Sequence, residues 1–183
     1  PLLAGCAAYR RDEADAARLL AATRCDAKPD DVVLGRRFMD KKQTWRLYGV
    51  FDGGAFVVGR AELRDDDDET ELKGTLDAFD VAARTGSIGG VAFVVPPDAR
   101  VVDAEGADVD PARAVPGRWA KAELKPGDAG LVLLKLQLRD RADGEDEVLQ
   151  GVVRAVSHAR GEATIGGVPA RFGRDARYVF AKK

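Results

Sequence analysis

Two closely similar stretches decide how this chain folds: Ser-Ile-Gly-Gly-Val-Ala-Phe at residues 87–93 and Thr-Ile-Gly-Gly-Val-Pro-Ala at residues 164–170. Each places two glycines between short apolar runs, and such pairs supply the positive φ that a two-residue β-hairpin needs. When the chain is shifted by 77 residues, 12 of the 32 positions between 72 and 103 match 149–180 without a gap. Matches at one fixed spacing, concentrated at the turn glycines and the apolar positions beside them, indicate a duplicated β-module.

The first half of each module repeats less rigidly. Leu63-Arg64-Asp65 recurs as Leu138-Arg139-Asp140, and Trp45 recurs as Trp119, each tryptophan at the head of an expected strand. In the first module, Asp52-Gly53-Gly54 supplies a further hairpin turn. Strands are expected at 44–51, 55–63, 72–79 and 91–95, with a short strand ending at Ile88.

Five or so short strands with frequent turns in each module are typical of a small barrel, because closure removes the open edges that pair with other chains. Before the first module, residues 12–24 are rich in Ala and Leu, and Asp12 is a suitable N-cap, so a short helix is expected. The predicted fold class is mainly β: two tandem small β-barrels, OB-like or SH3-like, with one short N-terminal helix. The expected divisions are an N-terminal segment at 1–31, β-module 1 at 32–103 and β-module 2 at 104–183.

Composition argues against several classes of function. The 29 basic and 31 acidic residues give a net charge of -2, so the chain lacks the basic field that attracts nucleic acid. No apolar run approaches the roughly 20 residues that a membrane-spanning helix needs. One histidine and two distant cysteines cannot make a tetrahedral zinc site. We therefore expect no nucleic-acid partner, no transmembrane span and no metal centre built from histidine and cysteine.

The cysteines bear on location. Leu2-Leu3-Ala4-Gly5-Cys6 resembles the lipobox of bacterial lipoproteins, in which the cysteine becomes diacylated, although cleavage there would remove residues 1–5. A disulfide between Cys6 and Cys25, the only two cysteines, is a second interpretation, and two free thiols are a third. The first two imply export to the periplasm, the outer membrane or the extracellular space, and the lipobox also implies a lipid anchor.

Two segments of the sequence resemble a known family. They are Gly151-Val152-Val153-Arg154-Ala155-Val156, followed by Ala163-Thr164-Ile165-Gly166-Gly167-Val168, and Ala99-Arg100-Val101-Val102-Asp103-Ala104-Glu105-Gly106, followed by Pro116-Gly117. These segments are similar in sequence to a bacterial domain of unknown function that occurs in tandem in exported proteins and lipoproteins. The resemblance covers roughly residues 45–180. It implies a small β-barrel and an exported location, and it carries over no catalytic residue.

The residues do not indicate catalysis. His158 is the only histidine, and its counterpart in the first module is Val81, so the repeated scaffold does not need an imidazole there. Ser157 is its neighbour, but successive residues of a strand point to opposite faces, which is poor geometry for a Ser–His couple. We expect no catalytic residue and a protein that is not an enzyme.

Acidic residues in equivalent loops of the two modules are the strongest chemical candidates. Clustered carboxylates can supply the roughly six to eight oxygen ligands that calcium prefers. Neither loop has the spacing of an EF-hand, and charged hairpin tips commonly serve solubility and keep strand edges from pairing. Calcium is the one cofactor considered, and its candidate ligands are Asp65, Asp66, Asp67, Asp68, Asp140, Asp143 and Asp146.

The two tryptophans could form a platform on which a sugar or a base stacks, but the equivalence of Trp45 and Trp119 favours a shared role in the core. The expected function is non-catalytic: an exported bacterial structural or protein-interaction module of an envelope or extracellular assembly, with protein partners or self-assembly. One alternative is an OB-like protein that binds an oligosaccharide or another ligand, and a weaker one is a calcium-stabilised module. A binder should expose aromatic side chains on a sheet face, whereas an assembly protein should expose an apolar strip or an open edge.

Overall fold

The computed structural model describes residues 7–8, 43–64, 69–157 and 160–179. These residues are mainly β, as the sequence predicts: twelve strands form a single hydrogen-bonded sheet, and one 3-10 turn, η3, spans Pro111–Arg113. The helix expected at 12–24 lies outside the described residues. The strands are β1 (Ala7–Ala8), β2 (Thr44–Asp52), β3 (Ala55–Arg64), β4 (Thr70–Asp80), β5 (Thr85–Ile88), β6 (Val91–Val94), β7 (Arg100–Val102), β8 (Trp119–Gly127), β9 (Gly130–Arg139), β10 (Glu147–Ser157), β11 (Glu162–Ile165) and β12 (Val168–Val179).

The duplication is present in the backbone as well as in the sequence. Gly89 and Gly90 turn the chain between β5 and β6 with φ of 56° and 78°, and Gly166 and Gly167 do so between β11 and β12 with φ of 57° and 94°. The pairing of β4 with β5 shifts register between Leu76 and Ala78, and that of β10 with β11 shifts between Val153 and Ala155. These positions are 77 residues apart, so the repeat preserves irregularities as well as strands.

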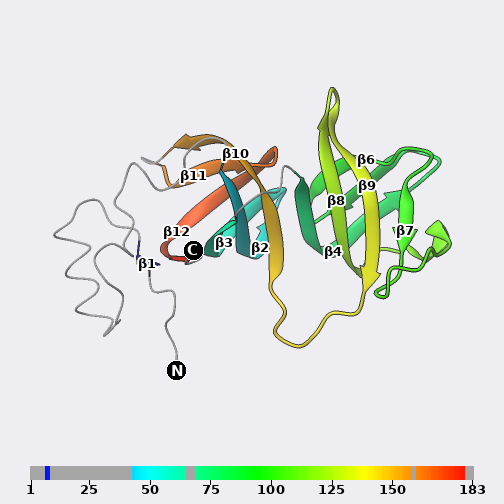
Figure 1. Cartoon of the computed structure of the whole chain (residues 1–183), viewed down its shortest axis with the longest axis horizontal. Helices are drawn as coiled ribbons and strands as arrows, with labels where there is room; N and C mark the ends of the chain where they lie inside the picture. The colour runs from blue at the N-terminus through cyan, green and yellow to red at the C-terminus, as the bar shows by residue number, and fades with distance from the viewer. Residues whose placement is uncertain (1–6, 9–42, 65–68, 158–159, 180–183) are drawn as a thin grey trace.

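Some strands pair with their neighbours in a closed circle, so that the last strand pairs again with the first. The structure contains two such circles of five strands each, which we call rings (Figure 1). Ring A runs β10-β2-β3-β12-β11 and back to β10, with β3 and β12 parallel. Ring B runs β4-β8-β9-β6-β5 and back to β4, with β6 and β9 parallel through Val94 and Val132. Each ring therefore consists of a two-stranded hairpin and a three-stranded meander.

The rings do not coincide with the modules expected at 32–103 and 104–183. Ring B combines the meander β4–β6 of the first module with the hairpin β8–β9 of the second, and ring A combines the hairpin β2–β3 with the meander β10–β12. The chain crosses from one ring to the other between β3 and β4 and again between β9 and β10. Either hairpin has the pattern to complete either meander, so the repeat alone does not specify which copies pair.

The rings join where β4 pairs with β10. Leu72 lies opposite Leu149, with Lys73 opposite Val148 and Glu71 opposite Gln150 on either side. Leu72 and Leu149 are equivalent residues of the repeat, so this pair marks a pseudo-two-fold axis between the rings. The core extends across the axis without interruption: one row of paired residues runs through six neighbouring strands, and all of its members are 0% exposed, namely Ala61, Leu47, Leu149, Leu72, Ala122 and Leu136.

Candidate functional site

The opposite face of the six-stranded region β3-β2-β10-β4-β8-β9 carries charge. Successive side chains alternate between the faces of a strand, so the neighbours of the apolar row form a polar row on the other side. Its paired members are Glu62, Arg46, Gln150, Glu71, Glu123 and Lys135. We call this surface, together with Arg60, Arg64, Lys73 and Lys121, the charged face.

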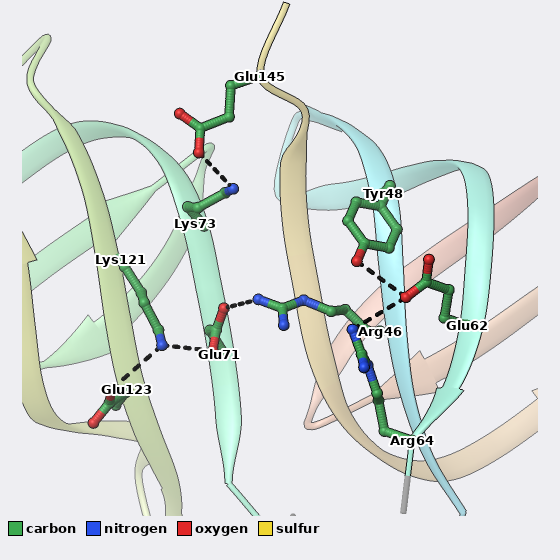
Figure 2. Close-up of polar contacts among 9 residues, drawn as sticks. All are labelled: Arg46, Tyr48, Glu62, Arg64, Glu71, Lys73, Lys121, Glu123 and Glu145. Carbon is green, nitrogen blue, oxygen red and sulfur yellow. Dashed lines mark hydrogen bonds and ion pairs between the residues drawn. The ribbon is translucent and has the colours of Figure 1, made fainter. Parts of the chain in front are cut away.

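Glu71 lies at the centre of the charged face, close to the pseudo-two-fold axis (Figure 2). Its side chain is 10% exposed and accepts from Arg46 at 2.7 Å across β10 and from Lys121 at 2.9 Å on β8. Lys121 also approaches Glu123 at 3.5 Å, and Glu123 accepts from Lys135 at 2.8 Å. The result is a continuous chain of alternating charges that crosses from ring A into ring B.

A second ion pair ties the loop before β10 to ring B. Lys73 donates to Glu145 at 2.8 Å, across 72 residues of sequence (Figure 2). The hydrogen bond from Lys73 lowers the pKa of the Glu145 carboxyl below its ordinary value, against an opposing effect of partial burial. The carboxylate of Glu147 accepts a hydrogen bond from the backbone N–H of Phe51. Glu145 and Glu147, two acidic residues at the end of the loop before β10, therefore both contact the folded sheet.

Each carboxylate of the charged face is paired with at least two cations. Glu62, at its ring A end, binds Arg60 at 3.0 Å, Arg64 at 3.1 Å and the hydroxyl of Tyr48 at 3.1 Å. Carboxylates that are already paired offer little unsatisfied negative charge to a cationic ligand. The arrangement can instead hold the two rings in one fixed orientation.

A shallow depression on ring A is the second polar feature. It has a volume of about 310 Å³, is open to solvent, and is lined by the end of β10, by β11 and by the start of β12. Its lining residues include Arg160, Arg171, Ser157 and Thr164. Arg160 is paired with Glu162 at 2.9 Å.

The tryptophans are buried, but they are not equivalent. Trp45 is 0% exposed on the apolar side of β2, and its ring N–H donates to Gln43 at 3.2 Å. The strand pairing matches Trp45 with Ala120, one residue from the expected Trp119, because each lies opposite an equivalent glycine, Gly151 or Gly74. A shift of one residue reverses the face, so Trp119 lies on the side of the charged face, 4% exposed, with the guanidinium of Arg141 4.5 Å from its ring centre.

The structure describes only some of the predicted site residues. Cys6, Cys25, His158 and the acidic residues 65–68 lie outside the described part of the chain. Asp140, Asp143 and Asp146 are exposed, and the described residues contain no group of three or more His, Cys, Asp or Glu side chains placed to hold a metal ion. The exposed large apolar side chains of the same part are Val50, Val81, Val115 and Leu134, none of them aromatic.

Sequence reasoning missed the charged face and the border of the depression. The charged face is assembled from six strands, so no local motif marks it. The depression left a signal in the repeat, since Arg160 and Arg171 align with Ala83 and Val94 in the first module.

Neither the family models nor the curated proteins nor the solved structures contain a match to this chain. Within the described ranges, no helix has the length and apolar character needed to cross a membrane.

Proposed function

We propose that this chain is a non-catalytic, exported bacterial protein in which two OB-like β-barrels act as one rigid structural or protein-interaction module of an envelope or extracellular assembly. The strand order of ring B supports the OB-like part. A meander of β4, β5 and β6 is followed by the hairpin β8–β9, with β4 antiparallel to β8 and β6 parallel to β9. This pairing pattern is that of a five-stranded OB fold, and ring A repeats the pattern with its hairpin placed before its meander.

The observation that carries the structural role is the charged face. Its ion pairs cross the boundary between the rings above an uninterrupted apolar core. Ion pairs that join two elements in a partly buried setting oppose their separation, although the Nε of Arg46 is buried without a hydrogen-bond partner among the described residues. Two barrels held at a fixed angle suit a protein that positions partners and does not need to open and close.

Rigidity is tested with two variants that each keep the tryptophan of only one ring. Trp119→Phe leaves Trp45 as the reporter for ring A, and Trp45→Phe leaves Trp119 as the reporter for ring B. In urea denaturation followed by fluorescence, we expect each single-tryptophan variant to give the same midpoint by fluorescence as by circular dichroism of the whole chain, because coincident probes are the sign of one cooperative unit. A ring that melts separately from the whole-chain signal in either variant would remove the basis for the proposal.

Either of two alternative interpretations of the cysteines supports export, a lipobox at Cys6 or a disulfide between Cys6 and Cys25, and so does the resemblance to exported tandem domains. The test is fractionation of bacterial cells that produce the full-length gene product, with metabolic labelling by an alkyne fatty acid. An acylated protein loses its label in the Cys6→Ser variant, whereas a disulfide-bonded one shows a mobility change on reduction. Recovery of the protein only from the cytosol would contradict export. A hydrolase or transferase activity that disappears on changing His158 would contradict the non-catalytic role.

A further inference from the structure

The two rings take aromatic core side chains from different elements. In ring A the hairpin contributes Trp45, which is 0% exposed, and the meander contributes Ala163 and Ala170, both buried in the core. The two alanines lie opposite each other in the pairing of β11 with β12. At these three positions the core of ring A therefore receives one aromatic side chain and two small ones.

Ring B has the reverse distribution at the equivalent positions. Its hairpin contributes Ala120, also 0% exposed, and its meander contributes Gly86 and Phe93, which lie opposite each other in the pairing of β5 with β6. Phe93 lies so close over Gly86 that a Cβ atom on that glycine would stand 2.3 Å from the aromatic ring. Ring B thus also receives one aromatic side chain and two small residues, but its aromatic side chain comes from the meander.

The repeat leaves a second way of pairing open, in which each hairpin completes the meander of its own module. One ring would then receive both Trp45 and Phe93, and the other would receive only Ala120, Ala163 and Ala170 at these positions. Protein interiors are close-packed, so added bulk and unfilled space at buried positions both destabilise the fold. The observed pairing avoids both faults at once.

We propose that these complementary core volumes decide which hairpin completes which meander, and so keep the two modules from folding as separate barrels. The other aromatic difference between the meanders, Phe172 in place of Val95, adds less to the core, since Phe172 is only half-buried. The inference rests on the proposed function, because it says what selects the arrangement in which the two barrels form one module.

The first test is urea denaturation of the full chain, followed by circular dichroism. One variant changes the hairpin of ring A, Trp45→Ala, and one changes its meander, Ala163→Gly with Ala170→Phe. Each should be less stable than the wild type, because the first leaves a cavity and the second adds bulk to a ring that already holds Trp45. Combining all three substitutions gives ring A the residues of ring B. The unfolding equilibrium constant of this combined variant should be at least about tenfold smaller than multiplying the two separate effects would give.

Trp45→Ala combined with Phe93→Ala is the matched control. Both substitutions remove an aromatic side chain, but from different rings, so their effects on the unfolding equilibrium constant should simply multiply. Effects that also multiply within ring A would overturn the proposal, and so would a coupling of the same size in the control.

The second test moves the aromatic side chain from one hairpin to the other, by Trp45→Ala with Ala120→Trp. Each hairpin then suits the meander of its own module. In the wild type Leu47 of β2 lies opposite Leu149 of β10, whereas in this exchanged variant Leu47 should lie opposite Leu72 of β4. Contacts between backbone amide protons in the isotope-labelled chain distinguish the two pairings.

An exchanged variant that keeps Leu47 opposite Leu149 would overturn the proposal. If this variant does not fold, the comparison of the ring A variants with their control decides. Separate melting of the two rings in the single-tryptophan variants would contradict the rigid module without changing the coupling within ring A, so failure of the proposed function and failure of this inference are distinguishable.

Discussion

Removing the carboxylate of Glu71 tests whether the charged face holds the two rings together. Glu71 accepts from Arg46 at 2.7 Å and from Lys121 at 2.9 Å with a side chain that is 10% exposed. A hydrogen bond to a charged group contributes about 1.5–3 kcal/mol, and removing one member of a fully buried pair costs about 3–5 kcal/mol. The two cations here are 26% and 23% exposed, so water compensates in part. We therefore expect Glu71→Ala to lower the free energy of unfolding by about 2–3 kcal/mol.

The measurement is urea denaturation of the full chain at neutral pH, with Glu71→Gln and Asp108→Ala alongside. The amide of Glu71→Gln keeps an acceptor for one cation but loses the charge, so about half the cost is expected. Asp108 pairs with Arg100 on the surface, where the side chains are 70% and 56% exposed, and its loss should leave stability nearly unchanged because water screens the pair. If Glu71→Ala costs no more than Asp108→Ala, the charged face does not join the rings and the argument for one rigid module fails.

Two further predictions concern contacts between ring A and ring B. Gly89→Ala should destabilise the protein more than Gly106→Ala. Both glycines have positive φ, but a Cβ on Gly89 would stand 2.2 Å from Phe51, whereas one on Gly106 meets open space. In urea denaturation we expect Gly106→Ala to cost about 1–2 kcal/mol and Gly89→Ala about 1–3 kcal/mol more, and equal costs would contradict the contact with Phe51. The pKa of Glu145 is lowered by its hydrogen bond from Lys73, so its stabilising contribution is complete above the ordinary value of 4.5 and is lost as the pH falls through the lowered folded-state value. The difference in unfolding free energy between the wild type and Glu145→Gln should therefore shrink on acidification below that value, and a difference that grows would refute the assignment.

The strands could be predicted from sequence because their signals are local. Gly89-Gly90, Gly166-Gly167 and Asp52-Gly53-Gly54 each mark a turn that the structure contains, and positive φ at a tight turn is a property of the residues themselves. Which hairpin completes which meander is not a local property. Each copy contributes a hairpin and a meander that alternate apolar and polar residues, so the alternation alone does not choose between the possible pairings.

The mismatch between Trp45 and Trp119 has a related cause. The hairpin halves of the two modules share few identities, so sequence alone allows shifts of 74 or 75 residues between them. The Trp–Trp match favours 74, whereas Leu63-Arg64-Asp65 and its repeat favour 75, and the strand register follows the second. In a strand of period two, that single residue decides between the core and the charged face.

The position of Glu71 explains why the copies had to diverge at the axis. Arg46 and Lys121 are equivalent residues of the two hairpins, and both bind the one carboxylate. The repeat places Val148, which is 1% exposed, at the position equivalent to Glu71, diagonally across the pair β4–β10. Diagonal neighbours are about 7–8 Å apart, so a second glutamate there would set two poorly solvated carboxylates against each other, and like charges at such a distance disfavour ionisation of both. The valine that stands in place of a second glutamate thus follows from the position of the axis.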